Sequence, residues 1–175
     1  MRRPDGSTGI FKSGDGALLV SEVSYIDAGN SGEAQRKTGF RAGPTLDEPA
    51  YDGKIALGGW YYTARFPDLS EVDASGDPVQ QRGSGGAYLL ADRVLYRAPG
   101  EDGGRLAGFV QAGLADPRVN RFGSYLGAGL VGTGFVPGRP NDQLGAAVAI
   151  ARNGAHFRSA QQALGTPANR AEIAI

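Results

Sequence analysis

Apolar and polar residues alternate along much of this chain, and a period of two predicts β-strands rather than helices. Between positions 143 and 151, Leu144, Val148 and Ile150 fall on one face of such a strand, whereas Gln143 and Gly145 fall on the other. We therefore expect a strand here with one bulky apolar face and one small or polar face.

The same alternation predicts about seven strands of roughly 6 to 13 residues, longer than the about 5 or 6 residues typical of soluble domains. The predicted strands cover residues 17–25, 54–66, 87–97, 105–115, 125–136, 141–151 and 171–175. Helical periodicity is scarce by comparison, so the chain is predicted to be an all-β protein.

The connections between these strands are of two kinds. Short, turn-rich connections occupy 98–104 and 137–140, and long polar ones occupy 26–52, 67–85 and 153–169. Short turns at one end of a sheet and long loops at the other are typical of outer-membrane barrels. The predicted fold class is an antiparallel transmembrane β-barrel, here a partial barrel of about seven strands. We find no fixed-period repeat and no domain boundary, so 1–175 is treated as a single region.

The stretch YLGAGLVGTGF contains Gly127, Gly129 and Gly132 in the spacing G-x-G-x-x-G, which resembles a dinucleotide-binding turn. Such a turn must open a helix, but the next residues, 133–140, include two glycines and two prolines. We therefore place these glycines inside a strand, where they thin one face and let a neighbouring group pack close to the backbone.

Composition narrows the function classes. The formal net charge is zero, which argues against a nucleic-acid partner, and the absence of cysteine excludes disulfides and thiolate metal sites. No apolar run approaches the roughly 18 to 20 residues of a spanning helix. The N-terminal stretch MRRPDGSTGIF also lacks the apolar core of a secretion signal.

Catalytic chemistry finds little support in the sequence. His156 is the sole histidine, in the stretch NGAHFRS with no acidic neighbour along the chain, and we expect it to be a solvated loop residue. The acidic pairs Asp47/Glu48 and Glu101/Asp102 lie in turn-rich stretches and are interpreted as solvated charges. The chain is therefore predicted not to be an enzyme, and no cofactor or metal is expected.

The segment KIALGGWYYTARF combines a charge with aromatic rings. If Lys54 marks its polar face, Trp60 and Tyr62 share that face, and Tyr61 lies on the other. Aromatic rings on a wet face suit sugar binding, because the ring packs on the sugar C–H surface. The three rings suit an aromatic girdle at a membrane interface equally well, and the sequence leaves both interpretations open.

Five segments follow one another along the chain: GKIALGGWYYTARF, GGAYLLADRVLY, GRLAGFVQAGLADP, YLGAGLVGTGFVPGRPNDQLGAAVAIAR and the closing RAEIAI. In their order and spacing they resemble the carbohydrate-selective porins of the OprB type. The resemblance is clearest over 53–175. It implies a large antiparallel barrel in the outer membrane of a Gram-negative bacterium, through which monosaccharides such as glucose diffuse passively without a cofactor. The implied partners are small sugars and outer-membrane lipid, with homo-oligomerisation left open.

The resemblance also implies that charged and aromatic side chains line the path. Combined with the alternation of apolar and polar residues along the strands, the resemblance gives a set that we call the candidate pore residues. They are Glu22, Lys54, Trp60, Tyr62, Arg105, Phe109, Gln111, Gln143 and Glu172. On the opposite face, Leu144, Val148 and Ile150 are expected to contact lipid.

The chain departs from the porin pattern in strand number, because about seven strands are fewer than the minimum of 8 for bacterial single-chain barrels. It also stops at Ile175 inside a strand pattern, so we interpret it as an internal to C-terminal portion of a porin barrel. An alternative is a soluble antiparallel β-protein that binds carbohydrate, and a glycoside hydrolase would need two convergent carboxylates. A soluble sandwich requires a second layer over the apolar face.

Overall fold

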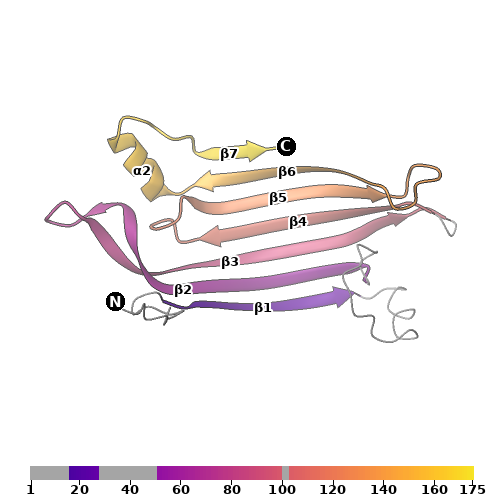
Figure 1. Cartoon of the computed structure of the whole chain (residues 1–175), viewed down its shortest axis with the longest axis horizontal. Helices are drawn as coiled ribbons and strands as arrows, with labels where there is room; N and C mark the ends of the chain where they lie inside the picture. The colour runs from indigo at the N-terminus through magenta and orange to yellow at the C-terminus, as the bar shows by residue number, and fades with distance from the viewer. Residues whose placement is uncertain (1–15, 28–50, 100–102) are drawn as a thin grey trace, which may run out of the picture.

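The computed structural model describes residues 16–27, 51–99 and 103–175, which form one antiparallel β-sheet with one short helix beside it (Figure 1). The strands are β1 (Leu18–Asp27), β2 (Gly53–Val72), β3 (Pro78–Arg97), β4 (Arg105–Ala115), β5 (Phe122–Thr133), β6 (Gln143–Asn153) and β7 (Ala171–Ala174), and the helix is α2 (Ala155–Ala163). The sheet order is β1-β2-β3-β4-β5-β6-β7, so each strand pairs with its neighbour along the chain. The all-β prediction is confirmed, and the described strands form an open sheet.

Residues paired directly across two strands project to the same side of a sheet, so the register defines its two faces. One row of cross-strand partners runs through every strand: Val23, Leu57, Leu89, Ala112, Leu126, Ile150 and Ile173. We call the side that carries this row the apolar face.

The opposite side, which we call the polar face, carries a different row. It passes through Glu22, Gly58, Tyr88, Gly113, Tyr125, Ala151 and Glu172. The alternation of bulky apolar with small or polar residues along each strand is thus continuous across the whole sheet.

No second layer of described residues covers the apolar face. Ala56 is the one fully buried hydrophobic residue in the described parts of the chain, whereas Leu144 is 83% exposed and Val23 is 79% exposed. A soluble sandwich would bury such side chains against a second sheet. The single layer therefore disfavours the soluble carbohydrate-binding alternative.

Three glycines of the polar face lie beneath aromatic rings. A Cβ on Gly129 would lie 2.6 Å from Cε1 of Phe109, and one on Gly86 would lie 2.6 Å from Nε1 of Trp60. Tyr88 occupies the corresponding space at Gly58. The prediction that strand glycines admit a close neighbour is confirmed for Gly129, which lies within the stretch YLGAGLVGTGF.

The long loop predicted over 67–85 was wrong. Strand β2 continues to Val72, β3 begins at Pro78, and the turn between them is closed by Asp73, whose Oδ1 accepts hydrogen bonds from the amides of Ser75 and Asp77 at 2.8 and 3.1 Å. After a register shift that follows Tyr62, the two strands pair only with each other. We call residues 65–82 the hairpin extension.

The connection 153–169 was also predicted as a loop, and it contains α2. Within the described residues, no helix has the length and apolar character needed to cross a membrane. A helix of nine residues with no acidic residue in its first turn leaves little trace in the sequence.

The predicted division into a short-turn end and a long-loop end was wrong as well. In this antiparallel order alternate strand ends meet, so β1 ends and β2 begins at the same end of the sheet where β3 is followed by β4 and β5 by β6 (Figure 1). Most of the β1–β2 connection, residues 28–50, lies outside the described residues, as do the acidic pairs 47/48 and 101/102.

Candidate functional site

The register places every candidate pore residue on the polar face. Glu22 belongs to the polar row itself, and Lys54, Trp60 and Tyr62 occupy alternate positions of β2 on the same side. Arg105 is paired with Thr133, which is in turn paired with Gln143, so these positions share the face near the other end of the sheet.

Glu22 is the centre of a hydrogen-bonded cluster on β1, β2 and β3. Its carboxylate accepts hydrogen bonds from Tyr88 Oη and Ser24 Oγ, both at 2.9 Å, and Lys54 Nζ lies 3.5 Å away. Glu22 and Lys54 are each about one-third exposed, so their charges remain accessible to a solute. Tyr88 was missed at the sequence level because the register of 87–97 was undefined there.

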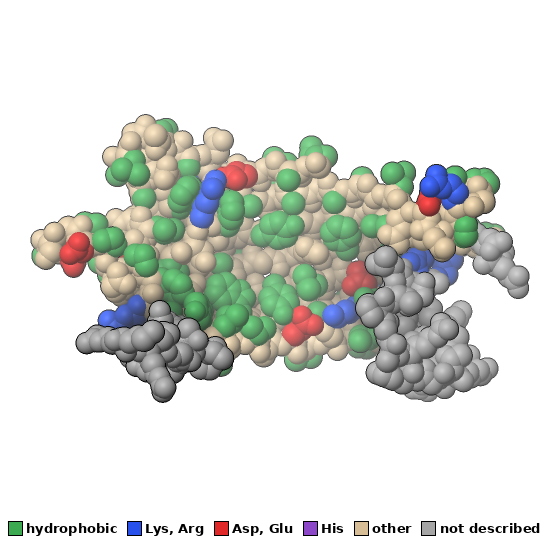
Figure 2. Space-filling view, viewed as in Figure 1, with side chains coloured by type: hydrophobic (Ala, Val, Ile, Leu, Met, Phe, Trp, Pro, Cys, Tyr) green, Lys and Arg blue, Asp and Glu red, His purple; other side chains and the backbone are tan. Residues whose placement is uncertain are grey.

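Lys54 begins a second row that combines charge with an aromatic ring. It is paired with Asp92, and Asp92 is paired with Phe109, whose ring packs over Gly129. Figure 2 shows acidic and basic side chains next to each other over β1 and β2, and a second such pair near the start of β7. The candidate pore residues are therefore distributed along the face rather than gathered at one point.

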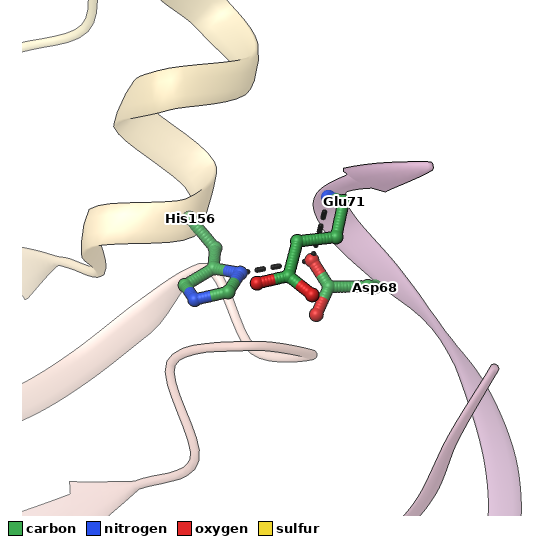
Figure 3. Close-up of side chains that lie close together, drawn as sticks. All are labelled: Asp68, Glu71 and His156. Atoms are coloured by element: carbon green, nitrogen blue, oxygen red, sulfur yellow. Dashed lines mark hydrogen bonds and ion pairs between the residues drawn. The ribbon is translucent and has the colours of Figure 1, made fainter. Parts of the chain in front are cut away.

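A different polar cluster joins three connections at one end of the sheet. Its centre is Asp68 of the hairpin extension, whose side chain is fully buried. The carboxylate accepts hydrogen bonds from the amides of Ser70 and Glu71 and from Gln81 Nε2, each at 2.9 Å, and His156 Nδ1 of α2 lies 2.8 Å away (Figure 3). Burial alone would raise the pKa of Asp68, but these hydrogen bonds outweigh it and hold the pKa well below the usual range of a carboxyl group.

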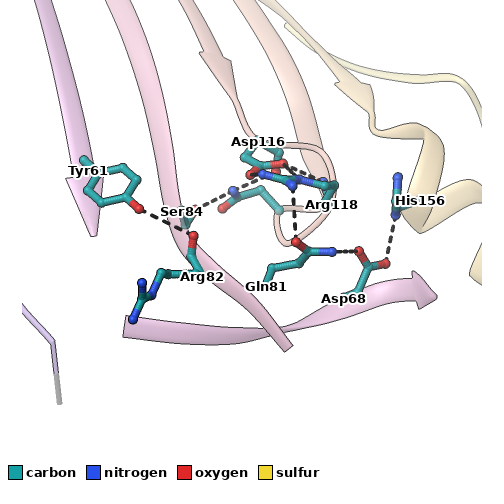
Figure 4. A network of polar contacts seen from close by, with 9 residues as sticks. Tyr61, Asp68, Gln81, Arg82, Ser84, Asp116, Arg118 and His156 are labelled. Carbon is teal, nitrogen blue, oxygen red and sulfur yellow. Dashed lines mark hydrogen bonds and ion pairs between the residues drawn. The ribbon is translucent and has the colours of Figure 1, made fainter. Parts of the chain in front are cut away.

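The cluster continues into the β4–β5 turn through Arg118. The guanidinium of Arg118 binds both oxygens of Asp116, at distances down to 2.7 Å, and donates to Gln81 Oε1 at 3.2 Å (Figure 4). The hydrogen bonds from Arg118 hold the pKa of Asp116 below its ordinary value. A backbone hydrogen bond of 2.9 Å from the Leu69 amide to the Arg118 carbonyl fixes the hairpin extension on this turn.

The structure corrects the interpretation of His156 as a solvated loop residue. His156 lies on α2, and its acidic partner Asp68 is 88 positions away in the sequence, where no local pattern could reveal it. Asp68, Glu71 and His156 place one ligand atom each within 4.8 Å of one another, a spacing that metal sites share. However, the Asp68 oxygens already accept hydrogen bonds from three protein groups besides His156, so we interpret the cluster as a structural link.

The described strands form an open antiparallel sheet in sequential order, with one polar face and one exposed apolar face. This is the architecture of a section of the wall of a membrane β-barrel. The family model described as carbohydrate-selective porin, OprB family, matches residues 4–175. The chain therefore belongs to the OprB family of carbohydrate-selective porins. This match begins at residue 4, whereas the resemblance noted in the sequence is clearest only from residue 53 onward.

The fold is similar to the high-pH structure of OprB from Pseudomonas putida, with a TM-score of 0.64 and 19% sequence identity. The similarity covers 91% of this chain and 38% of that chain, so this chain spans well under half the length of that porin. Comparison with curated protein sequences gives no significant match.

Proposed function

We propose that this chain forms part of the wall of a channel through which small sugars, such as glucose, diffuse passively across a Gram-negative outer membrane. The observation that carries this proposal is the division of the sheet: every candidate pore residue lies on the face opposite the continuous apolar row. In a barrel wall the polar face borders the lumen and the apolar face contacts lipid. The protein acts as a channel rather than as an enzyme.

The polar face offers the two kinds of partner that a sugar needs. Glu22, Lys54 and Asp92 provide charged groups for sugar hydroxyls, and Trp60 and Phe109 provide rings for the apolar surface of the sugar. A solute that must leave again has to be held weakly. We expect millimolar affinity, which corresponds to about 4 kcal/mol.

The register also bears on the choice between a sugar path and an aromatic girdle. Trp60 and Tyr62 project from the polar face, and the ring of Trp60 packs against Gly86 there, whereas Tyr61 projects from the apolar face. Girdle residues contact the membrane interface from the lipid side. We therefore assign Trp60 and Tyr62 to the sugar path and Tyr61 to the lipid-facing surface.

Planar-bilayer recording on the complete porin tests this proposal. Replacing Trp60, Tyr62 or Arg105 by Ala should raise the ion conductance and weaken the block of the current by added glucose, because each change removes a bulky group from the path. Tyr61→Ala is the matched control, since it removes a neighbouring ring from the opposite face. Unchanged sugar block in all three polar-face variants would show that the path lies elsewhere.

A further inference from the structure

At one end of the sheet, the hairpin extension, the β4–β5 turn (residues 116–121) and α2 lie together (Figure 1), and we call them the end cap. Helix α2 follows β6, yet it contacts β2, although β3, β4 and β5 separate these two strands in the sheet. The end cap therefore crosses several strands rather than continuing any one of them.

The turn of the end cap lies over the polar face. Ser84 and Asn153 both occupy polar-face positions and are almost fully buried. Ser84 is paired with Tyr62, and Asn153 lies two positions after Ala151 on β6. Asn120 Nδ2 donates to Ser84 Oγ at 2.8 Å, and Arg121 Nε donates to Asn153 Oδ1 at 3.2 Å. Residues of the turn thus cover polar-face side chains.

Helix α2 is held on the same side. The guanidinium of Arg121 lies over the rings of Phe122 and Phe157, at 5.0 and 4.9 Å from their centroids, and it also binds Glu172 on the polar face. Because Phe157 belongs to α2, this stack fixes the start of the helix above the polar face at the end of the sheet.

His156 connects α2 to the hairpin extension. Its Nδ1 contacts Asp68 Oδ1 at 2.8 Å and Ser70 Oγ at 3.0 Å. Asp68 accepts three further hydrogen bonds from its own hairpin, so this carboxylate stays solvated by protein groups when the histidine is removed. Loss of His156 should therefore free α2 from the hairpin extension without unfolding the hairpin, while the stack of Arg121 on Phe157 still holds the start of the helix.

We propose that Asp68 and His156 form a latch that holds α2 across the polar face and thereby limits the size of solute that passes this end of the channel. The inference rests on the proposed function, since the polar face must border the lumen for the end cap to narrow it. Both residues act as positioning residues, because they hold the helix in place and are not required to touch the sugar.

Spin labels test the latch itself. The chain has no cysteine, so cysteines introduced at Ser75 in the hairpin turn and Gln162 in α2, both exposed, report one distance. We expect a narrow distance distribution in the parent, a broad one in His156→Ala, and a narrow one in His156→Asn, whose amide nitrogen replaces Nδ1. Arg139→Ala is the control, because it breaks an ion pair of 2.7 Å at the opposite end of the sheet. A narrow distribution in His156→Ala would overturn the latch.

Liposome swelling with the complete porin tests the size limit. The rate for a trisaccharide relative to glucose should rise severalfold in His156→Ala and stay unchanged in His156→Asn and Arg139→Ala. An unchanged ratio in His156→Ala would overturn the size limit even if the label distance broadens. If the parent conducts no sugar at all, the proposed function fails, and the label distances still decide separately whether the latch exists.

Discussion

At the scale of single residues, the polar face is organised by aromatic rings that pack on glycines. Phe109 covers Gly129, Trp60 covers Gly86 and Tyr88 covers Gly58. Each ring occupies the space that a side chain at the glycine position would fill. Glycine at these positions therefore serves packing rather than backbone flexibility.

Gly129→Ala tests this arrangement. The new methyl group would lie 2.6 Å from Phe109 Cε1 and 2.8 Å from the Ala146 carbonyl oxygen, so the ring has to move and the backbone is crowded. We expect a loss of about 1 to 3 kcal/mol in unfolding free energy, measured by urea titration in detergent. Gly113→Ala is the control, since its nearest neighbour is 3.8 Å away, and it should be close to neutral. Equal losses in both variants would contradict the packing argument.

The ionisation of Asp68 should make the stability of the protein depend on pH. Its carboxyl has a pKa below the ordinary value of about 3.9. The ionised form therefore contributes stability that is complete above about pH 4 and is lost as the pH falls toward the lower folded pKa. Thermal unfolding in detergent should show Asp68→Asn less stable than the parent at pH 7, with the two midpoints converging toward pH 2. A constant gap over this range would rule out the titration of Asp68 as the cause.

Some of these residues were readable from the sequence and others were not. Glu22 and Lys54 were assigned to polar faces from alternation alone, and the register places both on one face, 3.5 Å apart. Tyr88 and Asp92 lie in a predicted strand whose register was undefined. His156 and Asp68 meet across 88 positions, and such a contact depends on how two connections fold, which no local pattern encodes.

At the scale of elements, the strands within the amphipathic part of the sheet were predictable because one face of each carries bulky apolar residues and the other carries small or polar ones. β4 was predicted over 105–115 and occupies Arg105–Ala115, whereas the 67–72 part of β2 was mistaken for a loop. That part pairs only with β3 and carries Pro67, Asp68 and Ser70 in place of an apolar alternation. A strand segment without an apolar alternation lacks the signal on which the prediction depends.

A pair of arginine substitutions in β6 tests the assignment of its faces. Val148 is on the apolar face with Ile150, and Gly145 is on the polar face opposite Val131. In the complete barrel, Val148→Arg should destabilise by about 2 to 4 kcal/mol if it lies near the bilayer midplane, whereas Gly145→Arg should mainly reduce conductance. Unfolding in lipid vesicles and single-channel recording measure the two effects. Similar stability losses with no change in conductance would show that the faces are assigned wrongly.

At the scale of the whole molecule, the described chain is a single layer whose apolar face has no protein cover. Exposed Leu, Val and Ile side chains cross all seven strands, and burying such a surface is the main source of stability for a sheet. Lipid or detergent supplies that burial for a membrane protein. The fold therefore depends on its solvent more strongly than a soluble sandwich would.

We predict that this polypeptide alone will not form a stable water-soluble monomer. Expression without detergent should give aggregates, and addition of detergent or vesicles should give β-sheet structure by circular dichroism. Size-exclusion chromatography with light scattering provides the measurement. A monodisperse monomer with a cooperative thermal transition in plain buffer would contradict the proposal that this chain forms part of a channel wall.

The order of the strands has a consequence for how such a wall changes over evolutionary time. Each strand is hydrogen-bonded only to the strands before and after it in the chain. Duplicating one hairpin would widen the wall by two strands and leave every other pairing intact. Because barrel diameter grows with strand number, the calibre of a channel built in this way can change in discrete steps by copying a single short piece of the gene.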